Sequence, residues 1–211
     1  FINKIPVRSD LAQSKQIARL KYSILIGLLI FYSLVTVTRN PVWKDNFSVW
    51  ANTVEKSPDT PIVHGGLGLA YQERGFLDEA IRELTTAIKL GPNMAKNHYN
   101  IGHAYEEKGL LENAIDPYKK AVELNPDYTD AYINLANLYM RLQLRKDAID
   151  AYRRVIELDP ADLEAYNNLG VAHAMQGEIG RAVGLWDKVL EMDPNNQKAT
   201  DNIAKAKKII N

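Results

Sequence analysis

Three asparagines recur in this sequence at equal spacing: Asn100, Asn134 and Asn168. A carboxamide carries both a donor and an acceptor, so it can pair with the backbone of an extended peptide whatever the sequence of that peptide. At the same spacing before Asn100, the equivalent position holds Gly66. The pattern therefore indicates either a ladder of peptide-binding groups or asparagines that simply lie on the surface.

The other residues that could do chemistry do not form a catalytic or metal-binding set. His98 and His103 are five apart, which is poor helical spacing for a shared metal, and the chain has no cysteine and no His-Glu-x-x-His motif. The acid pair Glu106/Glu107 is interpreted as solvated surface, because a paired-carboxylate glycosidase needs a closed cleft. We therefore predict no metal, no cofactor and no catalytic residue, with the histidines in packing roles.

The glycine-rich run from His64 to Gly68 could be mistaken for an oxyanion hole or a phosphate-binding loop. No predicted strand precedes it and no Gly-x-Ser-x-Gly nucleophile follows it, so neither motif has its required context. Gly65 and Gly66 are expected instead to let a ligand or a neighbouring chain approach the helix closely.

These residues belong to a repeat that the stretch 95–128 shows most clearly. The characteristic residues of this stretch are Ile101, Gly102, Tyr105, Gly109, Ala114, Tyr118, Ala121 and Pro126. The same or similar residues recur at one constant spacing, twice later in the chain and once earlier. The result is four copies in register over residues 61–196. The pattern closely resembles the tetratricopeptide repeat (TPR), a helix-turn-helix unit with the same period. The resemblance implies an all-α solenoid, a right-handed superhelix of such units.

Each repeat should contain two packed helices. The first helices are expected near 61–74, 95–108, 129–142 and 163–176, and the second near 77–90, 111–124, 145–158 and 179–192. Helix backbones approach closely where side chains are short, so the small residues of the first helix should meet those of the second. The first set is Gly68, Gly102, Ala136 and Gly170, and the second is Ala80, Ala114, Ala148 and Ala182.

Three features depart from a regular array. Pro117 falls inside a second helix, where it removes a backbone hydrogen bond, and Gly180 and Gly184 each destabilise theirs by roughly 1 kcal/mol relative to alanine. Residues 197–210 are predicted to form a capping helix with Ile203 and Ala204 facing inward.

The TPR resemblance also implies which residues line the concave groove of the superhelix. The three asparagines would face it and would resemble the asparagine ladder of O-linked N-acetylglucosamine transferase. The Lys/Arg positions with which chaperone-binding TPRs clamp a carboxylate hold other residues here, so a chaperone-tail receptor is disfavoured. The predicted partner-binding groove comprises Tyr99, Asn100, His103, Glu107, Asn134, Asn137, Arg141, Asn167 and Asn168.

Residues 22–38 contain neither a charge nor a proline, which is at the short end of the range for a membrane-spanning helix. A buried or interfacial helix is the alternative. Five Lys/Arg precede this stretch and place residues 1–21, a basic juxtamembrane segment, in the cytoplasm. The repeats would then lie on the non-cytoplasmic side, periplasmic or lumenal, although Arg39 and Lys44 weaken this assignment.

Residues 39–60 are predicted to form a half-repeat, with a helix from Trp43 to Lys56 that stacks on the first repeat. The pattern Arg39-Asn40, Trp43-x-Asp45 and Trp50 resembles the membrane-exit segment of TPR-bearing protein O-mannosyltransferases of the glycosyltransferase C superfamily. The resemblance implies that a catalytic membrane domain lies upstream of these residues.

The expected organisation is a juxtamembrane segment, a transmembrane helix, a half-repeat, four TPRs at 61–94, 95–128, 129–162 and 163–196, and a cap at 197–211. Its predicted function is a membrane-anchored interaction scaffold that binds an extended protein segment, with lipid around residues 22–38. Alternatives are the acceptor-binding tail of a polytopic glycosyltransferase and a single-pass assembly factor that joins a larger complex or self-associates. The formal net charge of zero argues against nucleic-acid binding.

Overall fold

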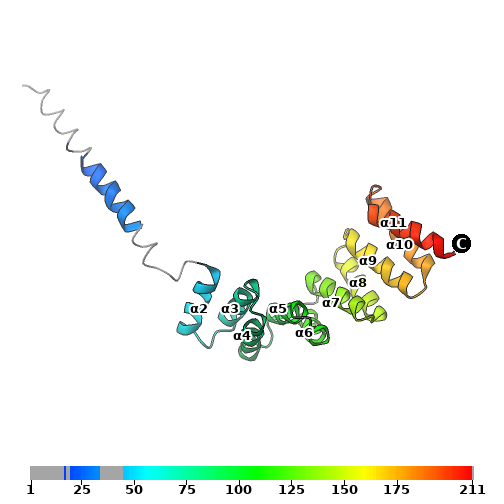
Figure 1. Cartoon of the computed structure of the whole chain (residues 1–211), viewed down its shortest axis with the longest axis horizontal. Helices are drawn as coiled ribbons and strands as arrows, with labels where there is room; N and C mark the ends of the chain where they lie inside the picture. The colour runs from blue at the N-terminus through cyan, green and yellow to red at the C-terminus, as the bar shows by residue number, and fades with distance from the viewer. Residues whose placement is uncertain (1–16, 18–19, 34–44, 211) are drawn as a thin grey trace, which may run out of the picture. The chain divides into compact units, whose positions relative to one another are not determined.

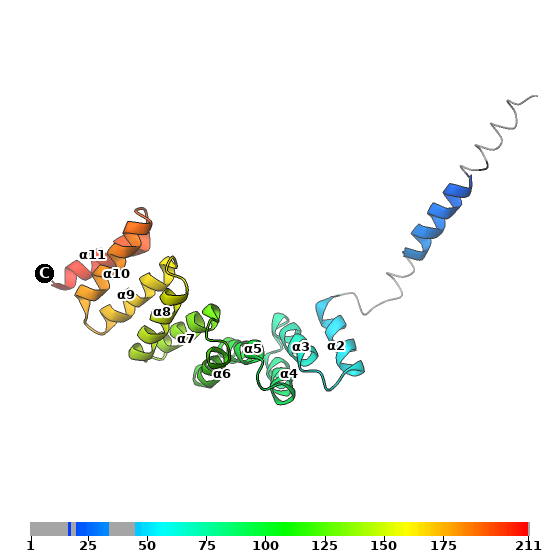
Figure 2. The same cartoon turned by 180° about the vertical axis from the view of Figure 1, so that it is seen from behind.

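The computed structural model describes residue 17, residues 20–33 and residues 45–210. The chain divides into two units, Phe1–Asn52 and Thr53–Asn211, and each is described by itself. In the second unit the helices follow one another as antiparallel pairs, with each packed against the next in sequence (Figures 1 and 2). Two longer-range packings join α3 to α5 and α9 to α11.

The helices begin at the residues predicted for them. The first helices of the four repeats, each ending one residue earlier than predicted, are α3 (Pro61–Glu73), α5 (Ala95–Glu107), α7 (Thr129–Arg141) and α9 (Leu163–Met175). The second helices are α4 (Leu77–Leu90), α6 (Leu111–Leu124), α8 (Arg145–Leu158) and α10 (Ile179–Met192). Helix α6 continues through Pro117, and α11 (Gln197–Ile210) follows the last repeat.

In the first, second and fourth repeats, the glycine of the first helix makes room for a large side chain on the second helix. A Cβ added to Gly170 would lie 2.4 Å from Nε1 of Trp186, and one added to Gly102 would lie 2.9 Å from the Tyr118 ring. For Gly68, the Leu84 side chain is nearest and the carbonyl oxygen of the predicted neighbour Ala80 lies slightly further away. At Gly68, the predicted contact with Ala80 is therefore longer than the contact with the Leu84 side chain.

The turn inside each repeat uses a left-handed backbone conformation. Gly75, Gly109 and Gly177 have φ angles of 78°, 79° and 83°, and Gln143, at the same repeat position, has φ of 60°. A side chain in this region meets the following carbonyl oxygen, which is why glycine is favoured there. Gln143 therefore adopts a conformation that the repeat imposes on it.

The C-terminal helix α11 covers the last repeat. Its buried residues are Ala199, Ile203 and Ala206, which pack around Trp186. Ile203 faces inward as predicted, but Ala204 is exposed, so that part of the prediction was wrong. Spacings of four and three residues keep 199, 203 and 206 on one helix face, and Ala204 lies about 100° away from Ile203.

The N-terminal unit contains a helix over residues 20–33. Among the residues the structure describes, no helix is both long enough and apolar enough to cross a membrane. Fourteen residues rise about 21 Å, whereas a hydrocarbon core is about 30 Å thick. The predicted span of 22–38 is thus not found in this part of the chain, and its residues 34–38 lie outside the description.

Helix α2 (Asn46–Lys56) lies within the predicted half-repeat and has no fully buried residue. Of the residues that carry the membrane-exit resemblance, Asp45 and Trp50 are described, whereas Arg39, Asn40 and Trp43 are not. The half-repeat arrangement stays a prediction.

Candidate functional site

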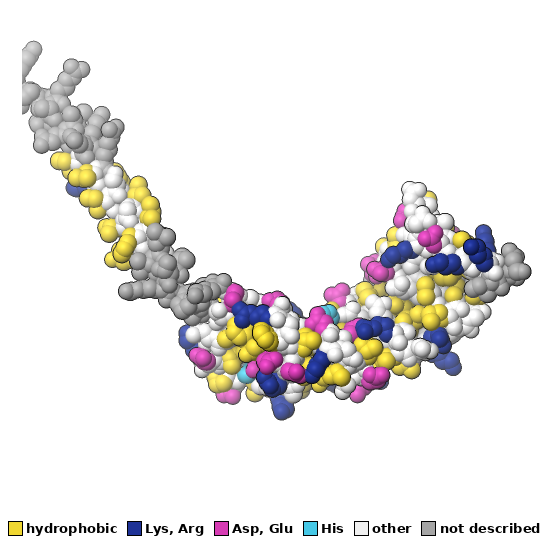
Figure 3. All heavy atoms as spheres, in the orientation of Figure 1, with side chains coloured by type: hydrophobic (Ala, Val, Ile, Leu, Met, Phe, Trp, Pro, Cys, Tyr) yellow, Lys and Arg dark blue, Asp and Glu magenta, His cyan; other side chains and the backbone are white. Residues whose placement is uncertain are grey.

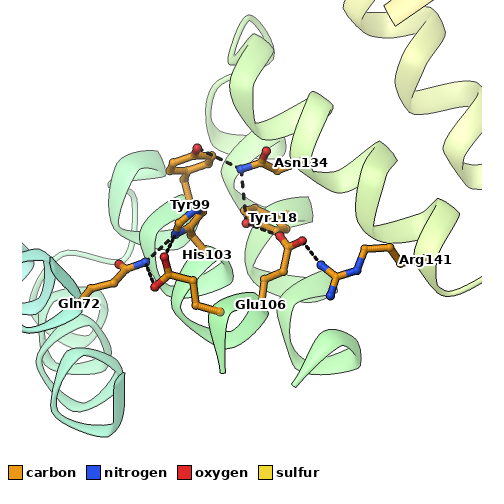
Figure 4. A network of polar contacts seen from close by, with 8 residues as sticks. Gln72, Tyr99, His103, Glu106, Tyr118, Asn134 and Arg141 are labelled. Carbon is orange, nitrogen blue, oxygen red and sulfur yellow. Dashed lines mark hydrogen bonds and ion pairs between the residues drawn. The ribbon is translucent and has the colours of Figure 1, made fainter. Parts of the chain in front are cut away.

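A polar network joins the first helices of the second and third repeats (Figure 4). Nδ2 of Asn134 on α7 donates to the hydroxyl of Tyr99 on α5 at 3.0 Å and lies 3.5 Å from the hydroxyl of Tyr118 on α6. The Tyr118 hydroxyl donates to Oε2 of Glu106 at 3.0 Å, and Arg141 pairs with the other oxygen of that carboxylate. Asn134 therefore uses its donor group inside the array.

The tyrosines of this network stay protonated at neutral pH. Burial of Tyr118, whose side chain is inaccessible to solvent, raises its pKa, and the charge of Glu106 raises it further. Burial also raises the pKa of Tyr99, with Asp130 as the next cause. Both hydroxyls can therefore donate and accept, and the Glu106–Arg141 pair closes this end of the network.

A hollow of about 300 Å³ lies between α3 and α5, the first helices of the first two repeats. Nε2 of Gln72 donates to Oε2 of Glu107 at 2.9 Å and lies 2.5 Å from Nδ1 of His103 (Figure 4). The opposite atom of the Gln72 amide, Oε1, is buried and has no hydrogen-bond partner among the described residues. The hollow is lined by Leu69, Gln72, Glu73, Tyr99, Asn100, His103 and Glu107.

The predicted groove residues fall into three groups. Four of them border the hollow, and Asn134 and Arg141 belong to the adjoining network; the four are Tyr99, Asn100, His103 and Glu107. Asn100 borders the hollow although it is only 5% exposed.

The other three predicted groove residues are engaged elsewhere. Oδ1 of Asn137 accepts a hydrogen bond from the Tyr152 hydroxyl at 2.5 Å. Asn168 also bonds to Tyr152: burial raises the pKa of this tyrosine to about 12, and the hydrogen bond to Asn168 acts to lower it. Nδ2 of Asn167 donates to the Leu163 carbonyl at 3.1 Å, and its side chain is buried.

The sequence prediction missed Gln72 and Tyr118. It was wrong for Glu106, which was interpreted as solvated surface but is 19% exposed and contacts both Tyr118 and Arg141. Gln72 and Glu106 occupy the same repeat position, immediately before the predicted Glu107 position in the second repeat. A comparison of polar residues at that position was the signal that could have found them.

A buried neighbour explains one glycine of the glycine-rich run. A Cβ on Gly65 would lie 2.6 Å from Oδ1 of Asn97, which is 4% exposed. The close approach predicted for a ligand or another chain at Gly65 is thus made by a side chain of the next repeat.

The histidines hold structural contacts. His64 lies with Nδ1 2.7 Å from Oε2 of Glu83 and Nε2 2.7 Å from the Pro58 carbonyl oxygen. Burial, the largest influence, lowers the pKa of His64, but these hydrogen bonds and the charges of Glu83 and Asp59 outweigh it and raise the pKa above its ordinary value. In the part of the chain that the structure describes, no three His, Asp or Glu side chains are grouped to hold a metal.

Known protein families match most of this array. A tetratricopeptide-repeat model matches residues 133–197, and a second TPR model matches residues 68–109 and 107–143. Together these segments cover more than half of the chain. The chain is a tetratricopeptide-repeat protein. The resemblance noted in its sequence is therefore confirmed.

Individual relatives share parts of this TPR chain. It is 32% identical over 83 residues to the protein O-mannosyl-transferase Tmtc2 of Drosophila melanogaster, a stretch that is 39% of this chain and 8% of that protein. The matched stretch thus spans less than a tenth of the length of this relative.

Solved structures share the TPR fold. A crystal structure of MamA has a TM-score of 0.66 and 28% identity, covering 72% of this chain and 89% of MamA. A MamA fragment from Desulfovibrio magneticus RS-1 has a TM-score of 0.61 at 21% identity, covering 71% of this chain and 90% of that one, and shows the fold alone. The predicted all-α repeat solenoid is confirmed by these likenesses.

Proposed function

We propose that this TPR protein is an interaction scaffold that binds an extended segment of a partner protein along the first helices of its repeats. The observation that carries the proposal is the hollow between α3 and α5, which combines the apolar side chain of Leu69 with polar side chains such as Gln72 and Glu107. Pockets that bind ligands combine apolar walls with a few polar groups in this way. Acidic and basic side chains are interspersed on the face of the array that Figure 3 shows, which does not favour a nucleic-acid partner.

The asparagines are less suitable than the hollow for testing this function. Replacing Asn134 would break contacts to two tyrosines, and replacing Asn100 would empty a buried position. Loss of binding in such variants would be mixed with loss of stability.

The test is therefore a variant that fills the hollow. Leu69→Trp on α3 adds volume at the wall, and Glu123→Trp, on an exposed carboxylate of α6, is the matched control. A displayed library of random twelve-residue peptides is selected against the immobilised full chain. We expect selected peptides to bind wild type and Glu123→Trp equally and Leu69→Trp at least tenfold more weakly. Peptides that bind all three proteins alike would contradict the proposal.

We further propose that residues 22–38 attach the protein to a membrane, with the repeats on the non-cytoplasmic side. Support comes from the described part of this stretch, where large apolar side chains are more than half exposed; among them are Ile24, Leu25, Leu29 and Phe31. Because the chain has no cysteine, single introduced cysteines can report the side on which they lie. Ser9→Cys should resist an impermeant maleimide in intact cells, whereas Lys198→Cys, at an exposed position of α11, should react. The reverse pattern would overturn the orientation, and full extraction by carbonate would overturn membrane attachment.

A second candidate function is that the repeats present acceptor protein to a glycosyltransferase domain of a longer parent chain. The likeness to the O-mannosyl-transferase Tmtc2 favours it. Intact mass and peptide mapping of the native protein test it: a mass far above 23.8 kDa with hydrophobic peptides ahead of Phe1 would support this candidate. A native chain of 23.8 kDa would exclude it.

A further inference from the structure

The hollow between α3 and α5 presents hydrogen-bond acceptors and aromatic faces but no cationic side chain among its lining residues. Glu107, whose side chain is 43% exposed, places its carboxylate at the rim, and Oε1 of Gln72 has no partner among the described residues. The rings of Tyr99 and His103 stack beside them, with centroids 6.3 Å apart and planes at 27°.

Two side chains of the array contact the Glu107 carboxylate. Nε2 of Gln72 donates to Oε2 at 2.9 Å, and Nδ1 of His103 lies 3.6 Å from Oε1 and 2.5 Å from Nε2 of Gln72. Among the described residues, no lysine or arginine side chain pairs with Glu107. A guanidinium from outside the chain could therefore approach this half-exposed carboxylate.

The next pair of repeats shows what is missing from the hollow. One repeat after Gln72 the equivalent residue is Glu106, and one repeat after Glu107 it is Arg141. Glu106 on α5 and Arg141 on α7 form an ion pair. In the first pair of repeats the same two positions hold glutamine and glutamate. The array thus supplies a guanidinium at this place between repeats two and three and supplies none between repeats one and two.

We infer that the hollow binds an arginine side chain of the partner's extended segment. Its guanidinium would donate to the Glu107 carboxylate, and its plane would lie against the Tyr99 and His103 rings, while the aliphatic stem contacts Leu69. Guanidinium groups favour such a combination of carboxylate and aromatic face because they are planar, carry several donors and are weakly hydrated. This inference rests on the proposed function and names the group recognised.

The test uses synthetic peptides of one design, acetyl-Ser-Ala-X-Ala-Ser-amide, in which X is arginine, citrulline, lysine or norleucine. Citrulline keeps the shape of arginine without its charge. Binding to the full chain is followed by NMR, through the ring signals of His103 and the side-chain amide signals of Gln72. We expect the arginine peptide to shift these signals and to bind at least tenfold more tightly than the citrulline and norleucine peptides.

Substitutions locate the recognition. Glu107→Gln should weaken the arginine peptide about tenfold, whereas Glu123→Gln, another exposed glutamate that lies on α6, should leave binding unchanged. Equal affinity for arginine and citrulline, or an unchanged affinity in Glu107→Gln, would overturn the inference. Equal affinity for lysine would overturn the specific assignment to a guanidinium.

The peptide library separates this inference from the proposed function. If library peptides bind wild type and not Leu69→Trp but are not enriched in arginine, the scaffold function stands and the arginine assignment fails. If no selected peptide depends on the hollow, the proposed function itself fails.

Discussion

Replacing Gly170 by alanine tests the packing between the two helices of the fourth repeat. The added Cβ would lie 2.4 Å from Nε1 and 2.8 Å from Cε2 of Trp186, so the indole ring must move. That ring is 3% exposed, and its Nε1 donates to the Asn167 carbonyl at 3.1 Å. Overpacking destabilises by about 1–3 kcal/mol and a lost hydrogen bond by about 0.5–1.5 kcal/mol, while alanine returns about 1 kcal/mol of helix propensity. We expect a net loss of about 1–3 kcal/mol.

The matched control makes the same substitution on the partner helix. A Cβ at Gly184 on α10 meets no atom within 4 Å, so Gly184→Ala should raise stability by up to about 1 kcal/mol through helix propensity alone. Urea unfolding of the full chain, followed by far-UV circular dichroism, measures both midpoints, which are compared at equal slope. If Gly170→Ala matches or exceeds wild type while Gly184→Ala behaves as expected, then the ring does not require the glycine and the packing argument fails.

Three further predictions test other features of the array. Gln143→Gly should raise the unfolding free energy, measured in urea, by up to about 1 kcal/mol because φ at this position is positive, and Gly109→Gln should lower it; equal values would contradict this. The pKa of His64 is raised, so the stability that its protonated form contributes is present below about pH 6.5 and is lost as the pH rises through the raised pKa. The thermal midpoint of wild type should therefore fall over this pH range by more than the midpoint of Glu83→Gln falls. Parallel curves would refute this. Tyr118→Phe should lower the unfolding free energy by about 1–2 kcal/mol through the lost bond to Glu106, and an unchanged thermal midpoint would show that this bond is not stabilising.

The repeat period made most of the fold predictable. A constant repeat length carries each helix start, each turn and even the left-handed conformation of Gln143 from one copy to the next, because every unit must stack on its neighbour in the same way. Beyond the last repeat, the sequence predicted the orientation of side chains less well. Ala204 lies in the capping helix, beyond the repeats, and its inward orientation was predicted wrongly because its helix face depends on contacts with only one neighbour.

The candidate site was predictable only in part, because its contacts cross between repeats. The period indicates that Tyr99, His103 and Glu107 share a helix face, and the structure brings all three to one hollow. It does not indicate that Gln72 reaches His103, or that Asn134 turns its amide toward tyrosine hydroxyls. Such pairings depend on side-chain orientation and on the burial of each group, which a spacing does not carry.

The two inter-repeat polar clusters differ in a way that relates stability to binding. Between α5 and α7 the carboxylate of Glu106 is paired with Arg141 and bonded by a buried tyrosine, so its charge is compensated within the chain. Between α3 and α5 the corresponding positions leave a carboxylate near the surface and an acceptor without a partner among the described residues. The same repeat position therefore holds an ion pair where this chain supplies the cation, and we infer that it recognises a partner where the partner must supply it.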